Sequence, residues 1–146
     1  MPGLHLLAAH HEDRLGILSF FLEGLHYNLV VRLLNDRFGI QARGGCSCAG
    51  TYGHYLLHVD PKRSRTITGK IDHGDLSEKP GWIRLSIHPT TTDAEARLLV
   101  AAVDAIARHG RAWAADYTYS STSNEYTHAS GPSLERPAVA RWFDLD

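Results

Sequence analysis

The feature that most constrains the fold is a strand pattern that leads almost directly into a helix pattern. Between Trp82 and His88 apolar residues occupy every second position, so Ile83, Leu85 and Ile87 share one face of a predicted strand. The other face carries more polar side chains. A strand with one wholly apolar face requires a second layer of structure to cover that face.

The second layer follows in the sequence. Thr92 to Glu95 is a capping-box signature, and it predicts a helix that begins here and ends at Gly110. The apolar face of this helix consists of residues at helical spacing, namely Leu99, Ala102, Val103 and Ile106. The combination predicts a sheet covered by helices.

Two further elements precede this unit. The stretch Leu15–Leu22 is short and apolar on both faces, which favours a buried strand over a helix. Apolar residues at helical spacing then predict a helix to Phe38, with Asn28 as its N-cap and Gly39 as its stop. Residues 40–43 are expected to form a short strand that leads into a glycine-rich loop.

The remaining elements are shorter. We expect one or two helical turns over Tyr52–Val59, a surface helix over Ser64–His73 and a hairpin in the aromatic stretch after Trp113. The fold class is therefore α+β, with a small antiparallel or mixed sheet covered by helices. This domain spans residues 1–130, and residues 131–146 form a tail.

Composition narrows the class of protein. The 146 residues are 43% hydrophobic and 21% charged, which is typical of a soluble globular domain. The formal net charge of −1 offers no basic field for nucleic acid or an acidic membrane. Leu15–Leu22 is too short to cross a bilayer, and residues 1–25 lack a signal-peptide pattern, so we expect a cytoplasmic protein.

The loop from Arg43 to Gly50 is the segment closest to chemistry. It contains Cys46 and Cys48, which are too near each other to form an unstrained disulfide. Glycines give the loop unusual backbone angles, and Arg43 would favour a thiolate, the reactive form of cysteine. The alternative is that both cysteines are small buried fillers, and the residue pattern leaves the two interpretations open.

A zinc site is a further alternative at the same place. Cys46, Cys48, His54 and His58 supply four zinc-type ligands, with the histidines expected on one helix face. Structural zinc sites usually separate their cysteines by two to four residues, and the C-x-C spacing fits this rule poorly. We therefore predict no metal site.

Two other residues are candidates for substrate binding. Arg84 lies in the middle of the predicted strand, on the face opposite Ile83 and Leu85, and its guanidinium suits a carboxylate. An ion pair on the sheet face is the alternative that the pattern alone favours. His26, which precedes a predicted helix, either lines a cleft or makes a local hydrogen bond.

Two blocks of the sequence carry a resemblance to a known family. The run Leu25–Gly50 and the later run Lys79–Ser86 resemble, in the same order, the C-terminal small domain of class V aminotransferase-fold enzymes. This family includes cysteine desulfurases and selenocysteine lyases, which use pyridoxal phosphate. The resemblance extends to Gly110 and more weakly to about His128. It implies the small-domain fold of fold-type I pyridoxal-phosphate enzymes.

The resemblance also implies roles for individual residues. Cys48 falls on the cysteine that attacks the substrate's sulfur or selenium, Arg43 on the arginine of the same loop, and Arg84 on the arginine that holds the substrate carboxylate. The family's two histidines before the nucleophile are Cys46 and Ser47 here. Cys46 is a second catalytic candidate, as the partner of Cys48. His26 remains a substrate-binding candidate because of its position before the predicted helix, and not because of the resemblance.

The cofactor is expected elsewhere. In this family pyridoxal phosphate is bound by a large N-terminal domain through a Schiff-base lysine. None of the chain's three lysines, Lys62, Lys70 and Lys79, follows a histidine as that lysine does. We therefore expect a fragment or split subunit that binds no cofactor alone, is inactive alone and joins a large cofactor-binding domain, with a homodimer as a further option.

Two other functions are compatible with the sequence. One is a sulfur-carrier or redox module that uses Cys46 and Cys48 without a cofactor. The other is a non-catalytic domain that binds a partner protein through apolar surface left exposed.

Overall fold

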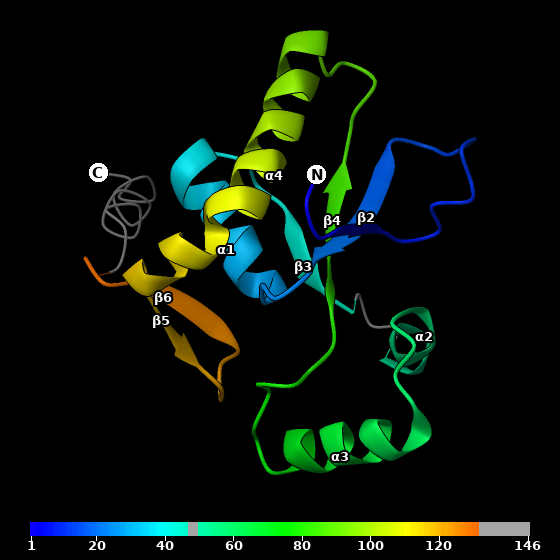
Figure 1. The fold of residues 1–146 in the computed structure, drawn as a ribbon, viewed down its shortest axis with the longest axis vertical. Coiled ribbons are helices and arrows are strands. Elements are labelled where there is room, and N and C mark those ends of the chain that lie inside the picture. The colour runs from blue at the N-terminus through cyan, green and yellow to red at the C-terminus, as the bar shows by residue number, and fades with distance from the viewer. Residues whose placement is uncertain (47–49, 132–146) are drawn as a thin grey trace, which may run out of the picture.

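The computed structural model describes residues 1–46 and 50–131, and these form an α+β fold of four helices packed on a four-stranded antiparallel sheet plus a hairpin (Figure 1). The sheet order is β1-β2-β4-β3, and every neighbouring pair is antiparallel. The predicted α+β class is thereby confirmed. The strands are β1 (Leu4–Leu6), β2 (Ile17–Leu22), β4 (Trp82–Ser86) and β3 (Arg43–Gly45).

Helices α1 (Tyr27–Phe38) and α4 (Asp93–Trp113) lie side by side and cover one face of the sheet (Figure 1). The core lies between these two helices and the sheet. Its fully buried side chains come from all three parts of this contact: Val30, Leu33 and Leu34 of α1, Ile83 of β4 and Ile106 of α4. Burying each large aliphatic side chain contributes roughly 1.5–3 kcal/mol.

The start of α1 differs from its prediction. The N-cap is His26, not Asn28, and the His26 imidazole Nδ1 accepts the backbone N–H of Asn28 at 3.2 Å. The Asn28 side chain instead donates to the backbone carbonyl of Asn124. The helix ends as predicted at Gly39, whose φ of 65° is the left-handed conformation that glycine adopts readily.

Helix α4 begins with the predicted capping box, in which Thr92 accepts from the Glu95 backbone and Glu95 accepts from the Thr92 backbone. The predicted end at Gly110 is wrong, because the helix continues to Trp113. Gly110 is buried, and a Cβ placed on it would lie 2.8 Å from Leu25 Cδ1. Glycine at this position allows a close approach to Leu25 and does not stop the helix.

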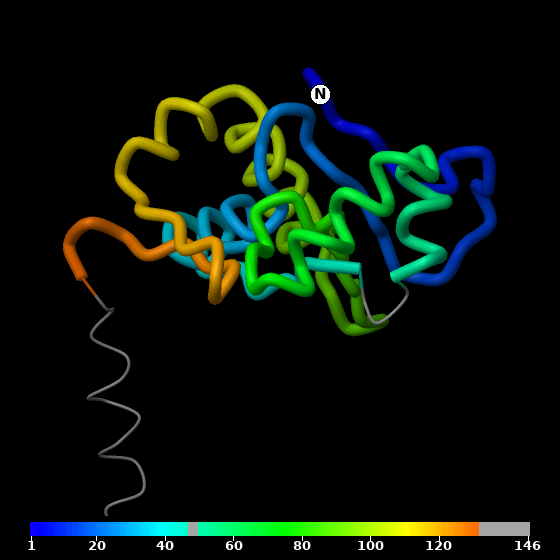
Figure 2. The backbone as a smooth tube through the Cα atoms, turned by 90° about the horizontal axis from the view of Figure 1, so that it is seen from below, coloured from blue at the N-terminus to red at the C-terminus, as the bar shows by residue number. Residues whose placement is uncertain are grey.

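Helices α2 (Gly50–Leu56) and α3 (Pro61–Asp72) follow β3, and each begins and ends slightly earlier than predicted. Asp60 caps α3 by accepting from the backbone N–H groups of Lys62 and Arg63. Figure 2 shows α2 and α3 in green, on the stretch of chain that connects β3 to β4.

The strand limits also differ from the sequence patterns. β2 begins at Ile17, and Leu15 is 84% exposed, so the expectation of a strand buried from Leu15 onward is wrong. β4 ends at Ser86, and β3 covers residues 43–45 where 40–43 was expected. Each strand extends only as far as a neighbour pairs with it, and the side-chain pattern does not report that length.

The predicted hairpin is present as β5 (Tyr117–Ser120) and β6 (Glu125–His128), joined to α4 by the short helix η1 (Ala114–Asp116). β1 was not predicted. Of the predicted tail, residues 132–146 lie outside the described residues.

Two glycine substitutions are expected to change stability in opposite directions. A Cβ at Gly81 would lie 2.6–2.8 Å from ring carbons of buried Tyr27, which cannot shift easily. Gly81→Ala should therefore lower the free energy of unfolding by about 1–3 kcal/mol. Gly69→Ala, inside α3 with no atom near the added Cβ, should raise it by up to about 1 kcal/mol. Urea unfolding of both variants measures this, and a neutral Gly81→Ala would contradict the packing argument.

Candidate functional site

The two candidate arginines lie directly opposite each other in the sheet. In the pairing of β3 with β4, Arg43 is the partner of Arg84 and Gly44 is the partner of Ile83. Since Ile83 faces the core under α1, Arg43 and Arg84 share the opposite face of the sheet. On its other side Arg84 is paired with Ser19 of β2. Like charges in directly paired positions weaken a strand pair.

Arg84 has no counter-charge in the part of the chain that the structure describes. Its Nε atom is buried and has no hydrogen-bond partner within residues 1–46 and 50–131, and Arg84 makes no ion pair with them. The alternative interpretation, an ion pair on the sheet face, therefore has no partner among these residues. A buried N–H without an acceptor is costly, so this atom is an exception to the usual pairing of buried polar groups.

Cys46 follows β3 directly and is half-buried. A Cβ placed on buried Gly53 would lie 3.4 Å from Cys46 Cβ and 3.3 Å from the Trp82 ring, so α2 packs closely over both. Cys46 is neither a fully buried filler nor a fully exposed thiol. Cys48, the predicted nucleophile, lies outside the described residues.

Tyr27 and Asn124 form a buried pair that sequence reasoning missed. The Tyr27 hydroxyl accepts from Asn124 Nδ2 at 2.6 Å, and Asn124 Oδ1 accepts from the Tyr119 hydroxyl at 2.9 Å. Burial raises the pKa of Tyr27, the bond from Asn124 opposes this rise, and nearby Cys46 adds to it. The phenol therefore stays protonated at neutral pH. The sequence signals were Gly81 and Gly44, whose missing side chains make room for the Tyr27 ring.

His26 does not join the arginines. It lies among three tyrosine rings, with centroid distances of 4.4 Å to Tyr27, 5.3 Å to Tyr119 and 5.5 Å to Tyr126. As the cap of α1 it belongs to the helical layer, whereas Arg43 and Arg84 lie on the other face of the sheet. The structure thus favours its local hydrogen-bonding role.

The protonation state of His26 follows from its contacts. Burial lowers the pKa of His26, and Nδ1 accepts a backbone N–H, so the ring is neutral with its proton on Nε2. Nε2 is buried and has no partner among the described residues.

The histidines of the zinc alternative are separated by the end of α2. His54 shares a hydrogen bond of 2.6 Å with Ser64 Oγ, and His58, with a φ of 52°, follows the helix instead of continuing it. The expectation that both share one helix face is wrong. In the ranges 1–46 and 50–131, no cluster of three metal-ligating side chains occurs.

The residues present do not fit a complete pyridoxal-phosphate site. Lys70 is ion-paired with Glu78, which raises the pKa of the Lys70 amine, and Lys62 is exposed in the first turn of α3. Lys79 lines a polar groove of about 900 Å³ between α1 and β6, together with the amides of Asn28 and Asn124. No described glycine lines this groove, so Lys79 does not lie beside a glycine-rich phosphate loop there.

Comparison of the sequence with protein-family models and with curated proteins finds no match in either. Among the described helices, none is both long enough and apolar enough to cross a membrane.

The state of His26 leads to a pH prediction. A folded-state pKa below the ordinary value means that His26 adds stability above pH 6.5 and loses it as the pH falls through the folded pKa. The His26→Asn variant keeps a good N-cap without a titrating ring. Between about pH 7.5 and about pH 5.5, urea unfolding should show a smaller loss of stability for His26→Asn than for the unmodified chain. His10→Asn, at an exposed site, is the control and should behave like the unmodified chain.

Proposed function

We propose that this chain is the substrate-binding small domain of a pyridoxal-phosphate enzyme similar to class V aminotransferases, with a cysteine desulfurase-like reaction. The observation that carries the proposal is the pairing of Arg43 with Arg84 on one sheet face, with Arg84 Nε buried and unpartnered among the described residues. In this proposal the pair binds the carboxylate of an amino-acid substrate.

A bound carboxylate would reduce the electrostatic cost of placing two arginines on one sheet face. It neutralises two cations that otherwise repel each other, and it accepts hydrogen bonds from their guanidinium groups. Arginine binds a carboxylate through two parallel N–H donors, so it fixes the orientation of the substrate as well as its charge. Lysine would supply the charge without that geometry.

The loop that carries the two cysteines follows Arg43 directly, and Cys46 lies three residues after it. Gly45 has a φ of 114°, a backbone conformation that side-chain-bearing residues rarely adopt, and it turns the chain from Arg43 into Cys46. Cys48 is the proposed sulfur acceptor and Cys46 its neighbour.

The cofactor is assigned to a separate large domain. The lysines support this assignment, because Lys70 is ion-paired with Glu78 and the groove beside Lys79 is lined by no described glycine. The chain alone is accordingly proposed to bind substrate carboxylate without turning the substrate over.

Carboxylate binding can be measured on the chain alone. Titration with acetate and with L-alanine, followed by NMR of the arginine Nε–H groups, should shift the Arg84 signal saturably. Arg84→Gln, followed through the Arg43 signal, and Arg43→Gln, followed through the Arg84 signal, should each weaken binding at least tenfold, since each removes one charged donor set. Arg65→Gln, at an exposed site on α3, is the matched control and should bind as the unmodified chain does. An Arg84 Nε–H signal that does not shift on addition of acetate or L-alanine would overturn the proposal.

Sulfur transfer is tested separately. After incubation with a cysteine desulfurase and L-cysteine, mass spectrometry should find an added sulfur on Cys48, lost in Cys48→Ser and retained in Cys46→Ser. The chain could instead bind no carboxylate and still form the persulfide, to the same extent in Arg84→Gln as in the unmodified chain. This outcome would favour the cofactor-free sulfur carrier. A Cys48 thiol that takes up no sulfur would remove the desulfurase-like part of the proposal.

A further inference from the structure

The solvent side of α4 carries a stripe of alternating charges with an apolar centre. Asp93, Arg97, Asp104 and Arg108 follow one another at intervals of four, seven and four residues, which returns each to the same side of the helix. The buried residues of α4, including Ala102 and Ile106, lie on the opposite side. We call the set Asp93, Arg97, Val100, Ala101, Asp104 and Arg108 the α4 stripe.

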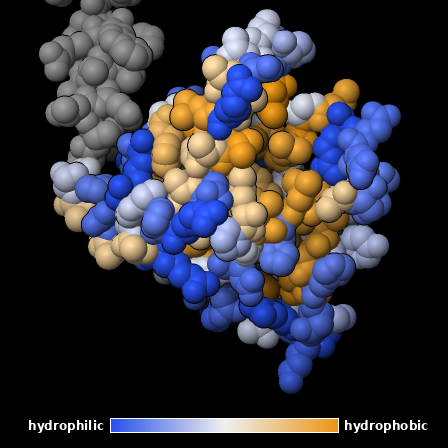
Figure 3. Space-filling model, turned by 45° about the horizontal axis from the view of Figure 1, so that its top comes forward, coloured by the Kyte–Doolittle hydropathy of each residue, from blue (hydrophilic) through white to orange (hydrophobic). Residues whose placement is uncertain are grey.

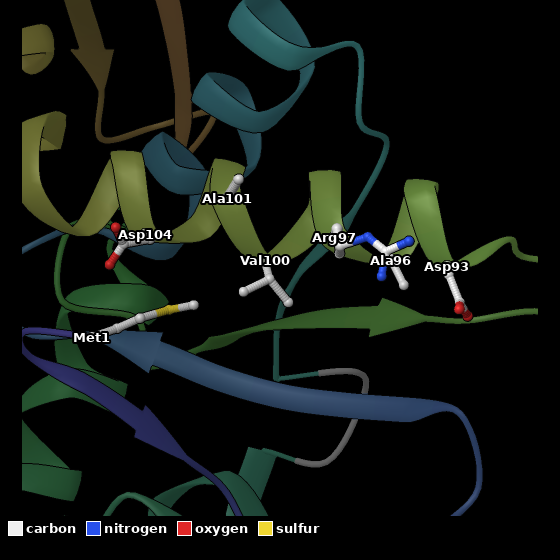
Figure 4. A pocket seen from close by; sticks show the side chains of 7 residues that line it. All are labelled: Met1, Asp93, Ala96, Arg97, Val100, Ala101 and Asp104. Carbon is white, nitrogen blue, oxygen red and sulfur yellow. The ribbon is translucent and has the colours of Figure 1, made fainter.

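The centre of the stripe is apolar and open. Val100 is 58% exposed, and Met1, itself 50% exposed, lies beside it (Figure 4). A groove of about 720 Å³ runs between Met1 and the helix and is lined by five of the six stripe residues. On the face that Figure 3 turns toward the viewer, apolar side chains form an area crossed by hydrophilic ones. An open apolar centre within charged ends is typical of an interaction surface.

The charges of the stripe are complementary to themselves. A second α4 laid antiparallel, with a two-fold axis between Val100 and Ala101, places Arg97 opposite Asp104 of the other copy, each about 5 Å along the helix from the axis. The same operation places Asp93 opposite Arg108 of the other copy, about 11 Å from the axis. Four attractive contacts result.

The ion pairs within one chain do not prevent the charged residues of the α4 stripe from contacting a second copy. Asp93 and Arg97 form no ion pair with any residue in the described ranges, and Asp104 pairs with Arg108 through Arg108 Nε at 2.8 Å. The Arg108 guanidinium lowers the pKa of Asp104, so this carboxylate is charged at neutral pH and can accept from a second arginine.

We propose that the α4 stripe binds a second copy of this chain, with the two α4 helices antiparallel about a two-fold axis at Val100–Ala101. The self-complementary order of charges selects this occupant, because an unrelated partner would have no reason to match it about one point. The contact is independent of the Arg43–Arg84 pair, so it stands whether or not the chain binds a carboxylate.

Charge reversal tests the proposal on the full chain. Sedimentation equilibrium should detect a dimer between about 10 µM and about 1 mM, the range expected of a small, transient interface. Arg97→Glu places a carboxylate opposite Asp104 twice per dimer, so the dissociation constant should rise at least tenfold. Asp104→Lys should do the same. The double variant Arg97→Glu with Asp104→Lys restores opposite charges and should recover the dimer. Arg65→Glu, on α3, should leave it unchanged.

A separate experiment tests the antiparallel orientation of the two α4 helices. In a Cys46→Ser and Cys48→Ser background, Ala101→Cys should form a disulfide-linked dimer under mild oxidation, because both copies of residue 101 lie at the axis. Ala112→Cys, exposed on the same helix, should not, because its two copies would be about 35 Å apart. A chain that stays monomeric at about 1 mM, or a dimer indifferent to both charge reversals, overturns the proposal. A dimer with equal cross-linking at both positions also overturns it.

Discussion

The contact on which most of the molecule depends is the approach of Tyr27 to two glycines, Gly44 in β3 and Gly81 just before β4. The Tyr27 ring occupies the space where side chains of Gly81 and Gly44 would otherwise lie, with added Cβ atoms 2.6 Å and 3.0 Å from it. Its hydroxyl meets Asn124 at the tip of the β5–β6 hairpin. One side chain thus joins the start of α1, the β3–β4 pair and the hairpin. Because it fixes α1 against β3, it also helps to hold Arg43 in register with Arg84.

Long periodic segments were predictable, and their ends were not. The apolar face of α4 and its Thr92 cap are local in sequence, so both could be predicted. Gly110 was wrongly taken as the end of α4, because its role is to let Leu25, which is distant in sequence, approach the helix closely. The His26 cap was missed because histidine is not a usual N-cap residue. β1, with three residues, is too short to have a recognisable period and exists through its pairing with β2.

The candidate site was predictable to a similar extent. Alternation in β4 placed Arg84 away from the core, as observed. The pairing with Arg43 needed the register between two strands far apart in sequence, and no local pattern encodes that register. Asn124 was missed for the same reason, since its role depends on Tyr27 and a left-handed backbone with φ of 59°.

The two edge strands of the sheet have a consequence for the behaviour of the chain in concentrated solution. β1 and β3 have three residues each, so each offers only a very short row of free backbone groups to a strand of another molecule. On β3 that row also carries an arginine and two glycines, which are poor templates for strand addition. Edge-to-edge aggregation is therefore disfavoured at both sides of the sheet. Arg43, proposed above to bind substrate, at the same time protects the sheet from unwanted growth.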